Sequence, residues 1–356
     1  MSTRTKSAFL KRAVPIGVVA AAACVATTTF AFGAGSGAKH AATSRAAGHN
    51  TAPVVNVSPN STASYWTEAR RKAAKPLDRA RSGATGQSAG TANLDFARSR
   101  ITPQTANKAA PYNGVGKLYF TEPGVGGFQC SASIIGNRLV VTAGHCVFGS
   151  GHYYTDWQFI PGFDGSQNTV AKQEPYGAWN WCAALAPGNY QATSSTVVND
   201  YDFAIIQFCD QSFNGGAPQT LYKKVKTKFN TAVGHLFDTH ATILGYPCNF
   251  DSCNIMQRVD SSDHRPSGVA SGTNGDTAYE YGSDMTGGSS GGPWVENFGN
   301  PGSAAPQGVF AGRNTVVAVT SYGYTDTSVL IQGASQFNAD FTSIKNTMCN
   351  FQAGNC

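Results

Sequence analysis

The sequence predicts an all-β domain from about residue 110 onward. Short β-prone runs recur along this part of the chain, and turns rich in glycine, asparagine and proline, such as residues 123–127, separate them. Helical periodicity is almost absent until the C-terminal tail. Many short strands with this punctuation are typical of a β-barrel or a β-sandwich.

The expected strands are residues 115–120, 131–135, 138–142, 157–160, 203–208, 241–246, 308–311, 316–321 and 328–331. One helix is expected, in the tail. Four apolar residues recur there at helical spacing and would form one face, with Ser335 as the candidate N-cap: Phe337, Phe341, Ile344 and Met348.

Charge is distributed unevenly along the 356 residues. Residues 1–107 hold 14 Lys and Arg against 3 Asp and Glu, whereas residues 108–356 hold 12 against 17. The net charge of +6 therefore reflects the first third of the chain. The mildly acidic remainder gives no basis for nucleic-acid binding.

Residues 1–38 are predicted to be a secretory signal peptide. Basic residues at 4, 6, 11 and 12 precede an apolar run from Val14 to about Phe32, and small residues at 31–33 or 36–38 offer a cleavage site. A membrane anchor is the alternative, which Pro15 and Gly17 disfavour because they make the run poorly apolar. A lipoprotein signal ending at Cys24 is a weaker alternative.

Residues 39–107 are predicted to be a propeptide that is largely disordered on its own. The segment is rich in Ala, Ser, Thr, Gly and Arg and has few large apolar residues, so burial cannot offset its ordering entropy. A linker for surface attachment is the alternative. A short basic helix could form from Glu68 toward Leu77, where Pro76 interferes.

The stretch Thr286–Pro293, which reads TGGSSGGP, has the features that a nucleophilic serine needs. Small neighbours allow a substrate carbonyl to approach and permit a sharp turn that directs backbone N–H groups at an oxyanion. A glycine-rich surface turn is the alternative, since glycine is common in turns.

Two upstream stretches disfavour that alternative. Residues 141–146 read VTAGHC and contain His145, and residues 199–206 read NDYDFAII and contain Asp202. A histidine, an aspartate and a serine in this order supply a base, the group that orients the base, and a nucleophile. His145 would take the proton of the serine hydroxyl, because imidazole titrates near neutral pH.

The three motifs together resemble those of the chymotrypsin-like serine peptidases, in particular secreted bacterial members. The resemblance covers roughly residues 110–350. It implies a peptidase domain of residues 108–356 that consists of two six-stranded antiparallel β-barrels and a C-terminal helix. It assigns Ser290 rather than Ser289 as the nucleophile, because Ser290 is followed by Gly-Gly-Pro. It favours Asp202 over Asp200, because Asp202 directly precedes an apolar strand. The N–H groups of Gly288 and Ser290 would form the oxyanion hole.

The resemblance also suggests where substrate binds. Asp284 lies six residues before Ser290, where trypsin-type enzymes carry the acid that binds Arg or Lys, so we expect a basic residue before the scissile bond. In that pattern the position of Thr286 is a cysteine that bridges the pocket wall. The alternative, without this cysteine, is a loop that runs differently and leaves Asp284 at the surface. Residues 319–323 resemble the strand that binds the substrate backbone and include three further candidate binding residues: Thr320, Ser321 and Gly323. The glutamate-specific branch of the family relies on a histidine in or beside this strand. No histidine is present here, which argues against a preference for glutamate.

Ser289 occupies a position that is aspartate in trypsin-type members, where that aspartate pairs with the new N-terminal amine after cleavage. Serine cannot make this ion pair. We therefore do not expect a trypsinogen-type switch at the bond between Arg100 and Ile101, and activity control is expected to depend on removal of the propeptide.

Eight cysteines remain once Cys24 leaves with the signal peptide, and an even number in an exported protein indicates disulfides. The resemblance supports a pair between Cys130 and Cys146. Proximity suggests Cys248–Cys253 and Cys349–Cys356, which leaves Cys182–Cys209 by elimination. No cysteine or histidine spacing predicts a zinc site.

The sequence therefore predicts a secreted serine endopeptidase that hydrolyses peptide bonds through an acyl-enzyme. Its expected partners are a peptide or protein substrate and its own propeptide. We expect a monomer that needs no cofactor or metal and binds neither nucleic acid nor, after signal removal, a membrane. The alternative is an inactive peptidase homologue that acts as a secreted binding protein.

Overall fold

The computed structural model describes residues 51–56, 59–82, 94–101, 108–234, 236, 239–262, 279–299 and 312–356. The expected signal peptide, the run 308–311, His235 and His264 lie outside these residues. No helix among the described residues has the length and apolarity needed to cross a membrane.

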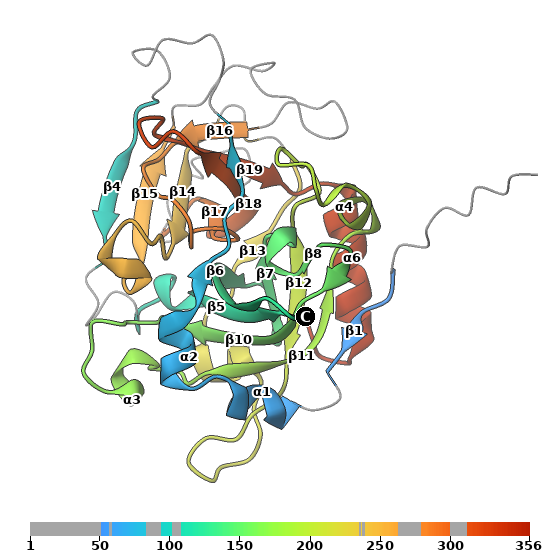
Figure 1. Ribbon diagram of the computed structural model, residues 1–356. Coiled ribbons are helices and arrows are strands. Elements are labelled where there is room, and N and C mark those ends of the chain that lie inside the picture. The colour runs from blue at the N-terminus through green and yellow to red at the C-terminus, as the bar shows by residue number, and fades with distance from the viewer. Residues whose placement is uncertain are drawn as a thin grey trace, which may run out of the picture. The chain divides into compact units, whose positions relative to one another are not determined.

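The first half of the domain forms a closed barrel of six strands (Figure 1). Antiparallel pairing runs in the order β11-β10-β5-β6-β7-β12, and β11 pairs with β12 to close the ring. Large aromatic side chains, among them Trp157, Trp179 and Phe208, are buried within the core that this sheet covers. The strands are β5 (Val115–Glu122), β6 (Gly126–Ile134), β7 (Leu139–Thr142), β10 (Thr155–Pro161), β11 (Trp179–Leu185) and β12 (Ala204–Phe208).

The second half forms a curled sheet with the strand order β16-β19-β18-β17-β14-β15. Within the described residues no pairing joins β16 to β15, so this ring is open where the first is closed. The mostly β architecture confirms the predicted fold class. The strands are β14 (Ala241–Gly245), β15 (Gln257–Ser261), β16 (Tyr279–Gly282), β17 (Pro293–Glu296), β18 (Thr315–Tyr324) and β19 (Ile331–Gln336).

The tail forms the helix α6 (Ala339–Phe351), as its spacing predicts. Phe341, Ile344 and Met348 are its buried residues. The predicted cap is wrong, because Ser335 lies in β19 and pairs with Val319. Asn338 caps the helix instead: its side-chain oxygen accepts the N–H of Asp340 at 2.9 Å.

Residues before the peptidase domain also fold against it. The strand β1 (Val54–Val55) pairs with β11, and β4 (Ala97–Arg100) extends the second sheet beside β15. Between them lie the helices α1 (Pro59–Tyr65) and α2 (Glu68–Ala73) and the strands β2 (Lys75–Pro76) and β3 (Ala80–Arg81). The segment that we expect to be disordered by itself is therefore ordered, over its described residues, by packing on the two sheets. We call residues 75–82 the leader strap.

Several small elements complete the fold: the helices α3 (Val170–Gln173), α4 (Gly188–Thr193) and α5 (Leu221–Val225), the short strands β8 (Phe148–Gly149), β9 (His152–Tyr153) and β13 (Asn230–Thr231), and the 3₁₀ turns η3 (Tyr112–Gly114), η4 (Gly144–Cys146) and η5 (Asp251–Cys253). The described residues form four disulfides, with the same four pairings that the sequence analysis expects: Cys130–Cys146, Cys182–Cys209, Cys248–Cys253 and Cys349–Cys356.

Candidate active site

His145 and Asp202 meet because their strands pair. His145 follows β7 in the turn η4, and Asp202 precedes β12, whose Ala204 pairs with Thr142 of β7. The ring atom Nδ1 of His145 lies 2.8 Å from Oδ2 of Asp202. The carboxylate also accepts the main-chain N–H of His145, at 2.7 Å from Oδ1. The Cys130–Cys146 disulfide fastens this turn to β6.

The fully buried carboxylate of Asp202 is kept ionised by its partners. Burial by itself would raise its pKa, but the charge and hydrogen bond of His145, the charge of Arg79 and the Ser321 hydroxyl hold the pKa below its usual value. The Ser321 hydroxyl donates to Oδ2 at 2.5 Å. The other ring nitrogen, Nε2 of His145, is buried without a hydrogen-bond partner among the described residues. That nitrogen is available to accept a proton.

Ser290 lies in the turn between β16 and β17 and is 3% exposed. Its neighbour Ser289 is occupied, because the Ser289 hydroxyl donates to the carbonyl of Thr286 at 2.6 Å and accepts from Nε2 of Gln332 at 2.7 Å. Ser290 lines a cavity whose walls also include residues of β18 and β19. Of the two adjacent serines, Ser290 is therefore the one suited to attack a bound group.

The backbone around Ser290 presents two unused donors. Ser289 donates its N–H to the Thr286 carbonyl and Gly291 donates to Thr320, whereas Gly288 and Ser290 donate no main-chain hydrogen bond within the described residues. Gly288 has a φ of +94°, a conformation that disfavours side chains. These are the two N–H groups that the sequence predicts for an oxyanion hole.

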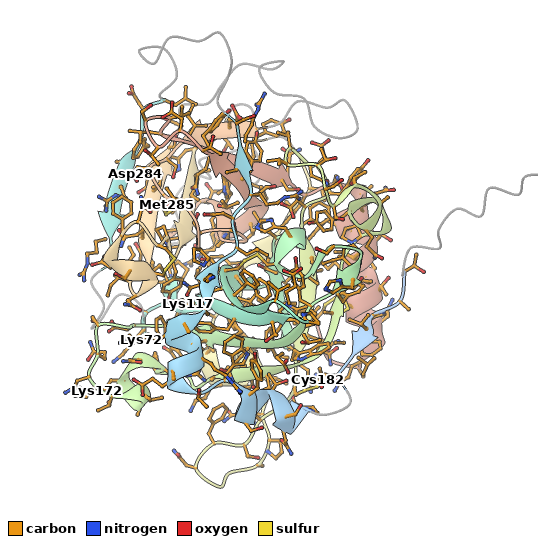
Figure 2. The ribbon with its side chains drawn as sticks, viewed as in Figure 1. Lys72, Lys117, Lys172, Cys182, Asp284 and Met285 are labelled. Carbon is orange, nitrogen blue, oxygen red and sulfur yellow. A yellow bond between two sulfur atoms is a disulfide. The ribbon has the colours of Figure 1, made fainter. Side chains whose placement is uncertain are left out.

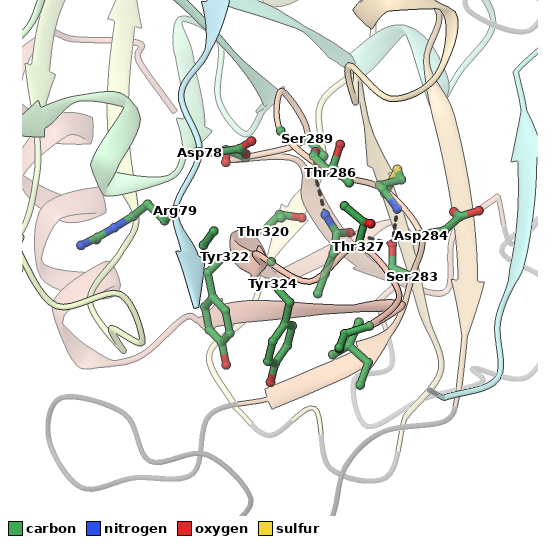
Figure 3. A pocket seen from close by; sticks show the side chains of 18 of the residues that line it. Asp78, Arg79, Ser283, Asp284, Thr286, Ser289, Thr320, Tyr322, Tyr324 and Thr327 are labelled. Atoms are coloured by element: carbon green, nitrogen blue, oxygen red, sulfur yellow. Dashed lines mark hydrogen bonds between the residues drawn. The ribbon is translucent and has the colours of Figure 1, made fainter. Parts of the chain in front are cut away.

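Polar and charged side chains from several segments line the cavity beside Ser290 (Figure 3). Gln332 links two serines of this lining. Its Oε1 accepts from the Ser283 hydroxyl at 2.8 Å, and its Nε2 donates to the Ser289 hydroxyl. Asp284 lies at the edge of this lining with its carboxylate directed outward toward β4 (Figures 2 and 3). There Nε of Arg98 donates to Asp284 at 2.9 Å.

The other candidate binding residues lie on β18 and have different partners. Thr320 accepts from the indole N–H of Trp294 at 2.9 Å, so its side chain supports the sheet. Ser321 bonds Asp202, as described above. Only Gly323 of the three contacts an extended peptide segment: its N–H donates to the carbonyl of Arg79 at 3.0 Å.

That segment is the leader strap, whose Asp78 and Arg79 line the pocket drawn in Figure 3. Its first part pairs in parallel with β6, and its last part, β3, pairs in parallel with β18. Between them, Asp78 and Arg79 line both the cavity of Ser290 and a second hollow that His145 lines. The carboxylate of Asp78 lies so close to Gly287 that any side chain at position 287 would collide with it. The strap therefore lies beside both Ser290 and His145.

Sequence reasoning missed Asp78 and Gln332. Neither belongs to a motif, and both reach the site through contacts between segments far apart in the chain. The rivals are not at the site: His240 lies near Asp260 on the second sheet, and Asp200 accepts from Asn338 through its carbonyl. His152 accompanies Ser150 in the β8–β9 hairpin.

Cys130, His145 and Cys146 form a group with ligand atoms close enough to hold a metal ion. The two cysteines are joined in a disulfide, however, and a disulfide sulfur is not the thiolate that binds zinc.

Comparison with known proteins identifies the family and similar folds. The trypsin family model matches residues 103–341. The fold is similar to the crystal structure of the protease Anisep from Arthrobacter nicotinovorans, with a TM-score of 0.53 and 24% identity over 70% of this chain and 98% of that one. It is also similar to the thermostable serine protease AL20 from an extremophilic microorganism, with a TM-score of 0.51 and 22% identity over 67% of this chain and 98% of that one. A search of curated protein sequences returned no match.

The fold and the matched family define a serine endopeptidase of the chymotrypsin-like class. The chain belongs to the trypsin family.

Proposed function

We propose that this protein is a secreted endopeptidase, made as an inactive precursor, in which Ser290, His145 and Asp202 form the catalytic triad. Ser290 attacks the peptide carbonyl while Nε2 of His145 takes the hydroxyl proton, which it then returns to the leaving amine. Asp202 keeps the imidazole oriented and stabilises its charged form. The N–H groups of Gly288 and Ser290 bind the oxyanion, and water then releases the acyl-enzyme.

The two contacts that the Asp202 carboxylate makes with His145 are the main support for the proposal. One carboxylate accepts from the main chain and contacts the ring of the same histidine, which leaves Nε2 as the free basic nitrogen. His152 also has an Nε2 without a partner, but its Nδ1 faces a main-chain carbonyl, so the carboxylate on Nδ1 is what distinguishes His145. The unused donors of Gly288 and Ser290 add independent support.

The proposal is tested by peptide hydrolysis with paired serine variants. The full chain is produced, allowed to mature, and assayed on a mixed pool of fluorogenic peptides. S290A should lose essentially all activity while keeping the circular dichroism of the parent, whereas S289A should keep measurable turnover. Because S290A is also unable to process itself, its propeptide is removed with an added protease before the assay. Full turnover by folded, leader-free S290A would reject the triad and would favour a binding protein without catalysis.

The leader strap supports precursor control. Its backbone hydrogen-bonds to β6 and β18 on the two sheets, and Asp78 lies against the turn that holds Ser290. A substrate cannot occupy the cleft while the strap remains there. We propose that removal of the strap is the activating event. Cleavage-resistant precursor should therefore react with an active-site probe far more slowly than mature protein.

Secretion rests on the N-terminal sequence and on the four disulfides, which persist in oxidising compartments. Recovery of mature protein from the culture medium, with an N-terminus beyond residue 38, is the direct test. Protein retained in the cell with its apolar run intact would contradict it.

A preference for Arg or Lys before the scissile bond requires the carboxylate of Asp284 to leave Arg98. Arg98 belongs to β4, so a mature N-terminus beyond residue 98 removes this competitor. We propose that basic preference then appears, and that enzyme retaining β4 prefers neutral side chains that contact Ser283 and Gln332. The test is substrate profiling of enzyme that retains β4 and of enzyme that lacks it. R98A is the matched variant, because it removes the competing guanidinium while β4 stays in place.

A further inference from the structure

A second buried carboxylate lies beside the cleft, away from the triad. Glu280, in β16, is 1% exposed. The hydroxyls of Tyr322 and Tyr324 both donate to its Oε1, at 2.8 and 2.5 Å. Both tyrosines belong to β18 and line the cavity of Ser290. Burial of a carboxylate is costly unless hydrogen bonds and a cation compensate it.

The leader strap supplies a cation to this carboxylate. Nη1 of Arg81 lies 3.4 Å from Oε1 of Glu280. Arg81 pairs with Tyr324 of β18, and its carbonyl accepts the N–H of Thr325, the residue after β18, at 3.0 Å, so the backbone holds Arg81 as well as its charge. Its guanidinium lies 6.0 Å from the ring centre of Tyr324. An extended peptide paired with β18 can therefore present a basic side chain to Glu280.

Activation would remove this cation. Arg81 belongs to the strap, which must leave before a substrate enters the cleft. The two tyrosine hydroxyls stay, because they are part of β18. Burial and the charge of Glu280 raise the pKa of Tyr322, which keeps that hydroxyl protonated as a donor. The mature protein thus keeps an oriented carboxylate at the place that Arg81 occupied.

We propose that Glu280, with Tyr322 and Tyr324, forms an acidic subsite that selects peptides carrying Arg or Lys on the acyl side of the scissile bond, beyond the residue that enters the pocket. This inference rests on the proposed function and is separate from Asp284, which lies on the other side of the pocket lining. The subsite favours Arg over Lys, since a planar guanidinium can contact the carboxylate and lie over the Tyr324 ring together.

The test uses matured full-length protein and peptides that differ at one acyl-side position at a time. Each pair carries either Arg or citrulline, which has nearly the same shape without the charge. We expect kcat/KM to favour Arg by about tenfold at one position beyond the pocket residue, the effect of one charge-assisted contact. E280Q should reduce that ratio to near one. E122Q, which alters a carboxylate on the first barrel, should leave the ratio as in the parent.

A second measurement does not depend on the folding of E280Q. A synthetic peptide of residues 75–82 is compared, as an inhibitor of the parent enzyme, with the same peptide carrying citrulline at position 81. The citrulline peptide should inhibit about tenfold more weakly, again the effect of one charged contact. Equal inhibition, or Arg-to-citrulline ratios near one at every position in an enzyme that cleaves these peptides, would overturn the subsite and leave the proposed function intact. An absence of cleavage of every peptide would instead count against the proposed function.

Discussion

Asp202 binds His145 through both of its carboxylate oxygens: Oδ1 accepts the main-chain N–H at 2.7 Å, and Oδ2 lies 2.8 Å from Nδ1 of the ring. The first contact fixes the turn η4 and the second fixes the ring. Because the same oxygen Oδ2 also accepts from Ser321 of β18, the carboxylate joins the two sheets at the point where chemistry would occur.

D202N should lower kcat by about 10⁴-fold, since an amide in this place favours the wrong imidazole tautomer while leaving the fold intact. D210N is the control, because both oxygens of the Asp210 carboxylate accept from Arg138 at 2.7 Å, and it should retain most of the parent activity. The measurement is kcat on one good peptide substrate. Comparable losses in the two variants would show that Asp202 has no special role.

Acid stability should depend on the same carboxylate. The folded-state pKa of Asp202 is below its usual value, so the ionised group stabilises the fold above its unfolded-state pKa of about 3.9. That contribution is lost as the pH falls through the lower folded-state pKa. Both proteins carry S290A, which prevents self-digestion. As the pH falls below 5, the protein with D202N should therefore lose less unfolding free energy than the protein that keeps Asp202. Parallel pH curves from urea denaturation would contradict this linkage.

The pairing of His145 with Asp202 was predictable, because each of the two lies in a local motif next to an apolar strand. His145 and Asp202 flank β7 and β12, which pair directly. The partner of Asp284 was not predictable, since Arg98 comes from a segment 186 residues upstream. The strap was missed for a related reason: its composition predicts no order, and its order arises from pairing with β6 and β18.

The C-terminal helix illustrates a smaller failure. Helical spacing placed Phe337, Phe341 and Ile344 on one face, and the latter two are buried in α6. Phe337 precedes the helix, but its ring stacks on Phe341 with the ring centres 3.7 Å apart. The pattern therefore extended past the helix start, and Ser335 was taken as a cap although it belongs to the preceding strand.

Inhibition by the strap should strengthen in acid. Loss of solvent around Asp78 raises the pKa of its carboxyl, and the nearby charge of His145 opposes this only in part. The bound strap thus holds a proton more tightly than the free strap, so binding weakens as the pH rises through that range. We compare Ki for a peptide of residues 75–82 with Ki for its D78N form between pH 4 and 7. The Ki of the unmodified peptide divided by the Ki of the D78N peptide should rise with pH. A ratio that stays constant would contradict the prediction.

Lys117 should reduce stability below neutral pH. It lies in β5 (Figure 2) and is 3% exposed. Its ammonium group donates to the Cys253 carbonyl at 2.9 Å, and burial lowers its pKa to about 7. Below pH 7 the folded state bears the cost of a buried charge. As the pH rises from about 7 toward 10, the unfolded chain binds more protons than the folded one, so stability increases.

K117M should remove this dependence. In an S290A background it should be more stable than the parent at pH 6, with the advantage shrinking toward pH 10. K172M, which changes an exposed lysine, should follow the parent at every pH. Urea denaturation across the range provides the measurement. An advantage for K117M that does not change with pH would show that packing, and not charge, sets the difference.

The most direct test of the central claim is the site of covalent labelling. Matured protein is treated with a fluorophosphonate, which reacts with an activated serine in a formed oxyanion hole, and the adduct is located by peptide mass mapping. We predict one stoichiometric adduct on Ser290, which is absent when His145 is replaced by alanine. A folded, leader-free protein that forms no adduct, or one labelled on Ser289, would contradict the triad proposed here.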